Sequence, residues 1–334
     1  MMRTEVYTTP EAFDRLAGEW NALLKRSASD TLFLTNEWQK TWWRELGEGE
    51  LRILAMYESD ALVGIAPLFF AANPLGSPEV ALVGCKEVSD YLDFIFARGR
   101  EVACFRAVVD FLKSTDAPAW HTLALCNIIE TSPTLSTFAE MLNAEGWHAR
   151  VLFEDVCPVV ALPDTFEAYL AMLEGKERRE LQRKLRRASE DVTITFATDA
   201  TSLARDVDDF IALMKASAPS KAVFMTPRMA RFFHAAARAM FEAGRLQLAF
   251  LEVEGVRAAA YMNFVYGDAV LVYNSGLDPE KYAYLSPGQV LIARLIEKAI
   301  QDGRRLFDFL QGDEEYKYKL GGRDVKLYTL SARR

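Results

Sequence analysis

The chain has few of the residues on which metal sites and histidine chemistry depend. Among its 334 residues there are only three histidines and four cysteines. The cysteines stand at 85, 104, 126 and 157 and form no Cys-x-x-Cys pair, and the histidines stand at 121, 148 and 234. Such scatter argues against a zinc site and against a disulfide framework, and it fits a reducing compartment. We therefore expect no metal centre and no catalysis based on histidine.

Long apolar runs and excess positive charge are also missing. The longest apolar candidate, ALVGIAPLFFAA, is interrupted by Gly64 and Pro67, so no run reaches the roughly 18 residues that a membrane span needs. The first residues, MMRTEVYTTP, lack the apolar core of a signal peptide. The net charge of −8 disfavours general binding of nucleic acid. These features predict a cytoplasmic protein without a membrane span.

What the chain does have is ample apolar sequence, arranged in an order that occurs twice. Its length and its hydrophobic content of 51% suit two packed domains. The first half predicts a strand at 3–9, helices at 10–27 and 36–46, strands at 51–57 and 61–70, apolar runs at 79–84 and 91–96, a helix at 100–114 and a strand at 120–126. The second half predicts a strand at 192–198, helices at 199–217 and 226–244, strands at 246–253, 256–265 and 269–275, a helix at 287–302 and a strand at 305–312.

This repetition favours an α/β fold with a tandem duplication. We place the join near 150–165 and expect domains at 1–155 and 156–334. The alternative is two unrelated α/β domains. Asn36 is the expected N-cap of the helix at 36–46.

The stretch YLSPGQVL, residues 284–291, opens the helix at 287–302 in an unusual way. Ser286 can cap this helix, Pro287 can be its first residue, and Gln289 completes a Ser-x-x-Gln capping box. Gly288 places no side chain over the free amides, and such a helix start can bind phosphate. Capping alone would explain the serine, the proline and the glutamine, but it explains the glycine less well.

Six stretches together resemble one acyltransferase family. They are FLTNEWQKTWW (33–43), DALVGIAPLFF (60–70), SDYLDFIF (89–96), RRELQRKLRRA (178–188), YLSPGQVL (284–291) and FDFLQGDEEYK (307–317). Their order is similar to that in the CelD/BcsL-like, or cellulose-biosynthesis-like, acetyltransferases of the GNAT superfamily, which are related to the FemAB-type aminoacyltransferases. The resemblance implies two GNAT-like domains, of which only the second keeps a donor site.

The resemblance also implies an acyl-CoA, such as acetyl-CoA, as co-substrate, with no metal. The residues expected to bind it are Ser286, Pro287, Gly288, Gln289, Tyr273 and Asn274. The stretch SPGQ departs from the usual Gln/Arg-x-x-Gly-x-Gly/Ala signature of the superfamily at this helix start. The acceptor would be an amine, with an amino sugar of a surface polysaccharide or cell-envelope precursor as the candidate.

The strand at 305–312 and the residues after it carry the candidate catalytic groups. Asp308 lies between Phe307 and Phe309, where a buried carboxylate is either a base with a raised pKa or one half of an ion pair. The resemblance points to Glu315, Tyr316 and Lys317, and either Lys317 or Lys319 can match a lysine near the reacting carbonyl of Fem-like enzymes. The remaining alternative is that these charged residues form a solvated turn.

Candidate acceptor groups lie in two other stretches. Asp90, Tyr91 and Asp93 begin an otherwise apolar run and can bind hydroxyl or amino groups, although a turn before an edge strand would look the same. Trp38 is expected in the core or in a wall against a sugar ring. The run 176–188 predicts a helix that packs through Leu181, Leu185 and Ala188 and keeps its other faces basic. Its expected ligand is an anion, and the alternative is a solvated surface helix. By resemblance, Arg183 is the member of this run expected to bind substrate.

Two other functions remain open at this stage. A Fem-like ligase would take aminoacyl-tRNA, bound through the helix at 176–188, and would not respond to coenzyme A. A non-catalytic binding module of a polysaccharide-synthesis system would bind neither donor. The sequence carries no signal for the oligomeric state.

Overall fold

The computed structural model describes residues 2–85, 88–188 and 191–334, and it divides the chain into two compact units. The first unit comprises the described residues up to Asp155 together with Val325–Arg334. The second unit comprises the described residues of Val156–Asp324.

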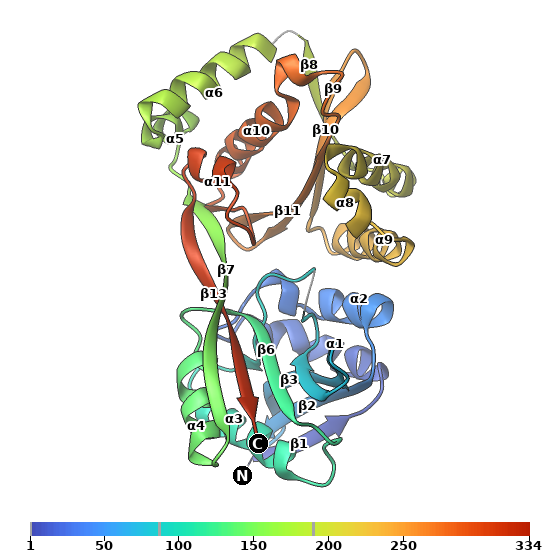
Figure 1. Ribbon diagram of the computed structural model, residues 1–334, viewed down its shortest axis with the longest axis vertical. Coiled ribbons are helices and arrows are strands. Elements are labelled where there is room, and N and C mark those ends of the chain that lie inside the picture. The colour runs from blue at the N-terminus through green and yellow to red at the C-terminus, as the bar shows by residue number, and fades with distance from the viewer. Residues whose placement is uncertain (1, 86–87, 189–190) are drawn as a thin grey trace. The chain divides into compact units, whose positions relative to one another are not determined.

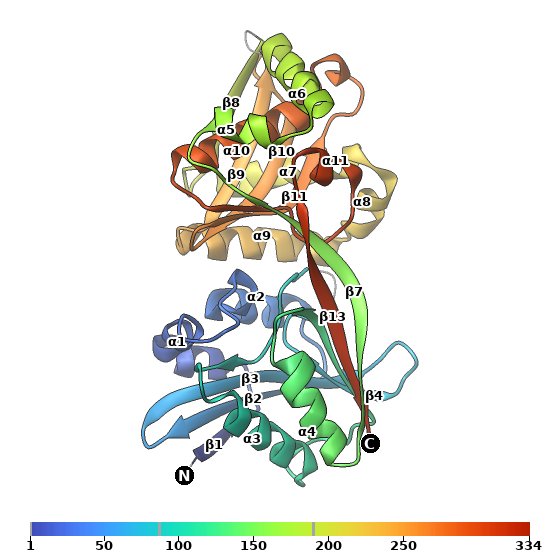
Figure 2. The same cartoon turned by 90° about the vertical axis from the view of Figure 1, so that its left-hand side faces the viewer.

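The first half of the chain alternates helices with strands that pair in order (Figure 2). Its elements are β1 (Met2–Tyr7), α1 (Glu11–Leu24), η1 (Leu32–Leu34), α2 (Asn36–Leu46), β2 (Glu50–Glu58), β3 (Ala61–Ala72), β4 (Pro78–Leu82), β5 (Ile95–Phe96), α3 (Glu101–Lys113), β6 (Thr122–Ile129), η2 (Thr134–Phe138), α4 (Ala139–Ala144) and β7 (His148–Ala161).

The second half contains the longer helices (Figure 1). Its elements are α5 (Phe166–Met172), α6 (Gly175–Ala188), β8 (Val192–Phe196), α7 (Leu203–Ser217), α8 (Pro219–Phe224), α9 (Pro227–Glu242), β9 (Leu246–Val253), β10 (Val256–Tyr266), β11 (Ala269–Leu277), η3 (Ala283–Leu285), α10 (Pro287–Gln301), β12 (Leu306–Asp308), α11 (Glu315–Lys319) and β13 (Arg323–Arg333).

The two units have the same order of strand pairings. In the first unit β1, β2, β3 and β4 pair antiparallel in sequence, β4 pairs parallel with β6, and β6 pairs antiparallel with β13. In the second unit β8, β9, β10 and β11 pair antiparallel, β11 pairs parallel with β12, and β12 pairs antiparallel with β7. The repeated order is consistent with the predicted duplication.

The last strand of the first unit comes from the end of the chain. We expected the second domain to extend to residue 334, but Val325–Arg334 belong to the first unit, because β13 pairs with β6 there. Residues 159–161 at the end of β7 lie within the second unit, where they pair with β12. The place of Val325–Arg334 does not follow from local sequence, since it depends on which distant edge the strand joins.

Helices cover both faces of the sheet in the second unit. Figure 1 shows α7, α8 and α9 on one face and α10 with α6 on the other. Most residues of α10 are buried, which fits its nearly continuous apolar sequence. In the first unit, Figure 2 shows α1 and α2 on one face of the sheet and α3 and α4 on the other.

The parallel strands of the second unit separate soon after they begin. β11 pairs with β12 only from Ala269 to Leu271, although β11 continues to Leu277. The register between β10 and β11 shifts here, because Met262 faces Asn274 whereas Asn263 faces Val272. Tyr273 is therefore the extra residue of a β-bulge, a feature that is frequent beside active sites. The bulge and the separation leave the later part of β11 without a strand on its β12 side.

Several local predictions need correction. Thr35, not Asn36, caps α2, because the Thr35 side chain accepts the Trp38 N–H, while the Asn36 side chain donates to the carbonyl of Phe13. The predicted strand at 305–312 has only three residues in strand form, since Leu310 adopts a positive φ of 55°. The elements β7, α8 and β13 were not predicted as they are, and the run at 91–96 forms only the two-residue β5.

The cysteines are not all free as predicted. Cys85 and Cys126 form a disulfide across 41 positions of sequence, with their Cα atoms 5.8 Å apart. The pairing was not foreseen because it depends on β4 and β6 being parallel neighbours. Cys104 and Cys157 are buried thiols.

Candidate functional site

The start of α10 differs from the predicted capping box. Ser286 occupies the N-cap position in a left-handed conformation, with φ 53° and ψ 54°, and its side chain makes no cap hydrogen bond. Its carbonyl accepts the N–H groups of Gln289 and Val290. Gly288 is buried, and a Cβ there would lie 3.0 Å from the Leu277 side chain. Close packing against β11 therefore accounts for the glycine, which we had attributed to an exposed amide.

The basic helix α6 lies beside the start of α10. Leu181, Leu185 and Ala188 are its buried residues, which confirms the predicted packing face. The Lys184 ammonium donates to the Gln289 side chain, and the Arg187 guanidinium donates to the Ser286 hydroxyl at 3.4 Å. Two cations thus meet a helix N-terminus, whose dipole is also positive, and such an arrangement favours an anion.

Arg183 does not take part in this contact. It lies on the exposed side of α6, and its charge lowers the pKa of the Glu180 carboxyl less strongly than Lys184 does. Lys184 forms an ion pair with Glu180, one turn earlier on the same helix. The residues of α6 that reach α10 are Lys184 and Arg187, one and four positions beyond the predicted one.

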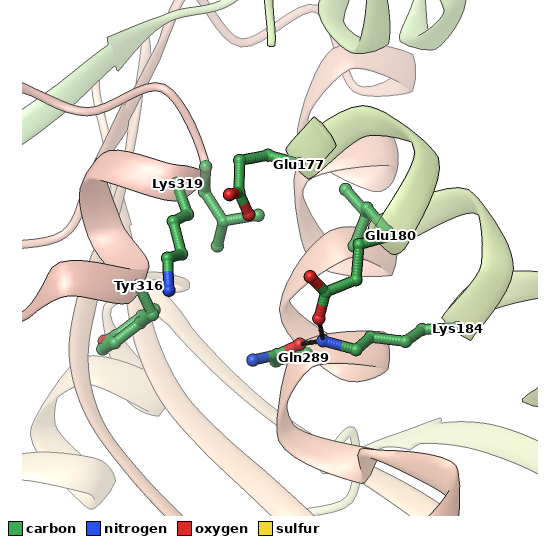
Figure 3. A pocket seen from close by; sticks show the side chains of 8 residues that line it. Glu177, Glu180, Lys184, Gln289, Tyr316 and Lys319 are labelled. Carbon is green, nitrogen blue, oxygen red and sulfur yellow. Dashed lines mark hydrogen bonds and ion pairs between the residues drawn. The ribbon is translucent and has the colours of Figure 1, made fainter. Parts of the chain in front are cut away.

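A small pocket lies between α6, the start of α10 and α11. Its volume is about 60 Å³. It is lined by Glu177, Glu180, Leu181, Lys184, Gln289, Tyr316, Lys319 and Leu320. Figure 3 shows Tyr316 and Lys319 on one side of the pocket and the two glutamates of α6 on the other. The helix start predicted to bind the donor is therefore next to a cavity that also contains one predicted catalytic residue.

Tyr316 is a neutral phenol at physiological pH. Burial raises the pKa of its hydroxyl far above the usual value, and the nearby Tyr261 and Glu314 raise it further. Its ring contacts the Phe309 ring edge to face, with the centroids 6.0 Å apart. A phenol in this state can donate a proton, but it cannot serve as a base near neutral pH.

Lys317 holds a loop together rather than pointing into the pocket. Its side chain is almost fully buried. The ammonium donates to the carbonyls of Leu310, Gln311 and Gly312 at 2.8–3.1 Å, and it pairs with the Glu314 carboxylate at 2.8 Å. An ammonium has only three donors, so this one has none left for a substrate.

Asp308 and Glu315 also have local partners. The Asp308 carboxylate accepts the N–H of Leu310 at 2.8 Å and so fixes the left-handed turn that ends β12. Glu315 is exposed and pairs with Lys319 at 2.9 Å. The Glu315 carboxylate raises the pKa of Lys319. Of the two lysines left open by the sequence, Lys319 lines the pocket and Lys317 does not.

Lys221, which was not foreseen from the sequence, reaches the unpaired part of β11 from α8. Its ammonium donates to the main-chain oxygen of Ser275 at 2.6 Å and lies 3.4 Å from the Ser275 hydroxyl. Burial lowers the pKa of Lys221, and the Glu314 carboxylate partly offsets this. Tyr261 is the neighbour of Ser275 on β10, and burial raises the pKa of this second phenol. The six-residue α8 is too short for periodicity to reveal it.

The two predicted donor residues on β11 have structural contacts. The Tyr273 ring packs against Phe264 and Phe233, with centroids 4.9 and 5.6 Å away. The Asn274 side chain accepts the N–H of Ser275 at 2.9 Å. Both main-chain groups of Ser275 are therefore bonded to side chains, one to Asn274 and the other to Lys221.

The predicted acceptor residues of the first unit lie in a loop before β5. Trp38 is fully buried and donates its indole N–H to the Ser89 hydroxyl at 2.9 Å, so it offers no face to a sugar and belongs to the core. Tyr91 is also buried and lies beside the Phe33 ring. Asp90 is half-buried. Asp93 is buried and lines a separate cavity of this unit.

Comparison with known proteins agrees with this architecture. Residues 175–318 match the family described as acetyltransferase (GNAT) domain. A tandem GNAT protein from the clavulanic acid biosynthesis pathway superposes with a TM-score of 0.51, at 13% identity, over 99% of this chain and 98% of that chain. The chain has the fold of two GNAT-like domains in tandem. The predicted fold class is thereby confirmed.

Two other solved structures share the tandem GNAT-like fold. FemX superposes with a TM-score of 0.70, at 12% identity, over 94% of this chain and 95% of that chain. The C-terminal domain of a putative lysylphosphatidylglycerol synthetase from Agrobacterium fabrum superposes with a TM-score of 0.59, at 11% identity, over 96% of this chain and 92% of that chain. No curated protein sequence matches the chain. The family match and the fold together support an N-acyltransferase.

None of the helices in the described part of the chain is both long and apolar enough to cross a membrane. Within residues 2–85, 88–188 and 191–334, no three histidine, cysteine or acidic side chains are grouped so that they could hold a metal ion.

Proposed function

We propose that the protein moves an acyl group, most simply acetyl, from an acyl-CoA to an amine acceptor. The observation that carries this proposal is the convergence of Lys184 and Arg187 on the start of α10, next to the pocket that contains Tyr316. A helix N-terminus and two cations fit the phosphates of coenzyme A. Ser286, Pro287, Gly288 and Gln289 would form this end of the donor site.

The reacting end would lie where β11 leaves β12. An acyl-CoA supplies a thioester carbon, which the amine attacks as the carbon–sulfur bond breaks. Negative charge then develops on the carbonyl oxygen, and the half-buried Lys221 ammonium beside Ser275 can stabilise it. The attacking amine is neutral and releases one proton to solvent water as the amide forms. The leaving sulfur gains one proton from the neutral Tyr316 phenol, which solvent water then reprotonates.

The remaining predicted site residues receive positioning roles in this proposal. Asp308 and Lys317 fix the loop at 310–312 between β12 and α11. Tyr273 and Asn274 fix the bulge of β11. Glu315 is exposed and paired with Lys319, so we assign it no chemical step.

The acceptor is proposed to be an amino sugar of a surface polysaccharide or cell-envelope precursor, as in the CelD/BcsL-like subgroup. Within the second unit, the exposed Arg183 is the predicted substrate residue that can contact its hydroxyls. The motif resemblance supports this acceptor, and the amine panel below tests it.

Calorimetric titration of the full chain with coenzyme A tests the donor. The accompanying assay is release of free thiol from acetyl-CoA in the presence of a panel of amines, with glucosamine included. Donor binding together with amine-dependent thiol release is the expected result. A gel shift with tRNA and no heat with coenzyme A would instead favour the Fem-like ligase. Binding of neither would favour a non-catalytic module.

A further inference from the structure

The first unit contains a cavity of its own that the proposed transfer does not use. Its volume is about 250 Å³, slightly below that of typical small-molecule pockets, so it fits only a small ligand. It is formed by the loop before β5, the start of α3 and the loop after β6. Its polar lining residues are Ser29, Asp93, Arg98, Glu101, Thr131, Ser132 and Thr134.

Asp93 gives this cavity a buried negative charge. Its carboxylate accepts the Phe94 N–H at 2.8 Å, the Thr134 hydroxyl at 2.6 Å and the Ser132 hydroxyl. All three donors are neutral, and no cationic side chain of the described residues pairs with Asp93. A buried carboxylate without a counter-charge is costly, and a positive ligand would remove that cost. Burial raises the pKa of Asp93 to about 6, so the carboxyl is mainly ionised above that pH.

With the other charged groups included, the lining of the cavity still carries a net negative charge. Glu101, in the first turn of α3, forms no ion pair with any residue that the structure describes. Arg98 donates its Nε to the carbonyl of Ser27 at 3.1 Å. Two carboxylates and one guanidinium give a net charge of −1, which matches a ligand with a single positive charge.

The apolar wall of the cavity limits the ligand to a small molecule. Phe94, Phe96 and Phe105 line it, and their rings contact one another with centroids 5.1–6.0 Å apart. These rings are packed into the core and therefore rigid. Their edges and faces can contact the carbon skeleton of a ligand whose charged end meets the acids.

We propose that this cavity binds a small, singly charged primary amine, whose ammonium group lies against the Asp93 carboxylate. The inference goes beyond the transfer reaction, because it stands on the first unit alone. It holds whether or not the second unit uses an acyl-CoA.

Three pairs of probes test the proposal on the full chain without any donor. Ethanolamine, glucosamine and benzylamine are each compared with an uncharged analogue, namely ethylene glycol, N-acetylglucosamine and benzyl alcohol. Saturation-transfer NMR at pH 8 measures which of each pair binds. At least one amine is expected to bind clearly, and its analogue about 10-fold more weakly or not at all. If no amine binds better than its analogue, the proposal is overturned.

Variants then locate the binding. Asp93→Asn keeps the shape and most hydrogen bonds but removes the charge, so it should abolish the preference for the amine. Asp110→Asn is the matched control, because it removes one charge from the exposed side of α3, and it should leave binding unchanged. Unchanged amine binding by D93N would place the ligand elsewhere and refute the proposal.

A second set of measurements keeps the test decisive if D93N does not fold. Glu101→Gln should weaken amine binding several-fold by removing the second acid of the cavity. In the wild-type chain, binding should weaken as the pH falls through about 6, because Asp93 then takes up a proton. Glu101 and Arg98 are the other charged groups that line the cavity, and the E101Q variant separates the Glu101 effect. Full binding by E101Q together with pH-independent binding by the wild type would contradict the proposal.

Discussion

The Lys221 ammonium donates a hydrogen bond of 2.6 Å to the main-chain oxygen of Ser275, on the part of β11 that β12 leaves unpaired. This contact brings a cation to the point where two parallel strands separate. Glu314 lies near enough to raise the pKa of Lys221, and it also pairs with Lys317. The pair of Lys221 and Ser275 therefore links α8, β11 and the loop before α11.

Lys221→Met should slow the transfer without preventing donor binding. The loss of a positive group near the carbonyl oxygen predicts a turnover reduced about 10- to 100-fold. Thiol release from acetyl-CoA measures the rate, and calorimetry with coenzyme A measures binding. A variant as active as the wild type would remove Lys221 from the mechanism while leaving the proposed function intact.

Lys184→Ala combined with Arg187→Ala should weaken coenzyme A binding. Each lost charged contact to phosphate predicts an affinity about 10-fold lower, and the dependence of binding on salt should become shallower. Lys176→Ala is the control, because Lys176 is an exposed residue on the first turn of the same helix. If the double variant and K176A lost the same amount of affinity for coenzyme A, the effect would be one of overall charge and not of contacts at the start of α10.

Tyr316→Phe separates proton donation from packing. The phenyl ring should keep its contact with Phe309, whereas the proton donor is lost, so turnover should fall about 100-fold with little change in donor affinity. Because burial raises the pKa of Tyr316, its phenol should stay protonated up to about pH 9. The wild-type rate should therefore not fall in this range through ionisation of Tyr316. A pH profile of thiol release measures both. If Y316F were fully active, a group other than Tyr316 would have to donate the proton to the leaving sulfur.

The features that could be predicted from the sequence are those that depend on short-range interactions. The face of α6 made of Leu181, Leu185 and Ala188 was predictable, because it depends only on helical spacing. The bounds of β9 and of most of α10 were also predictable, because the turn residues Gly255 and Gly303 and the helix-opening Pro287 mark them. The repeated order of elements then gave the fold class.

The details of the site were less predictable, because they depend on partners distant in sequence. Lys221 matters only because α8 meets β11, and the disulfide forms only because β4 and β6 are neighbours. Lys317 looked catalytic in the sequence, but its ammonium satisfies three loop carbonyls. The residue types in the sequence indicated the right segment of the chain for the site. The role of each residue within that segment became clear only from the contacts of its side chain.

The stability of the first unit should depend on pH through Asp93. Its pKa is raised by burial from 3.8 to about 6, so folding favours the protonated form. The contribution of Asp93 to the free energy of unfolding is therefore fully present below about pH 4, and it is lost as the pH rises through about 6. Asp93→Asn should be more stable than the wild type by up to about 3 kcal/mol at about pH 8, but not at about pH 4. Denaturant titrations at the two pH values measure this, and an equal difference at both would contradict it.

Replacement by alanine should lower the stability of the protein at one glycine, Gly276, and raise it at another, Gly18. A Cβ on Gly276 would lie 2.2 Å from the main-chain nitrogen of Met214, so β11 and α7 would have to separate. Gly276→Ala should therefore destabilise the protein by about 2–4 kcal/mol. Gly18 is an exposed residue inside α1, and a Cβ added there would have no atom within 4 Å, so Gly18→Ala should stabilise by about 0.5–1 kcal/mol. Thermal melting compares the two. A melting temperature for G276A equal to that of the wild type would mean that α7 does not pack on β11 this closely.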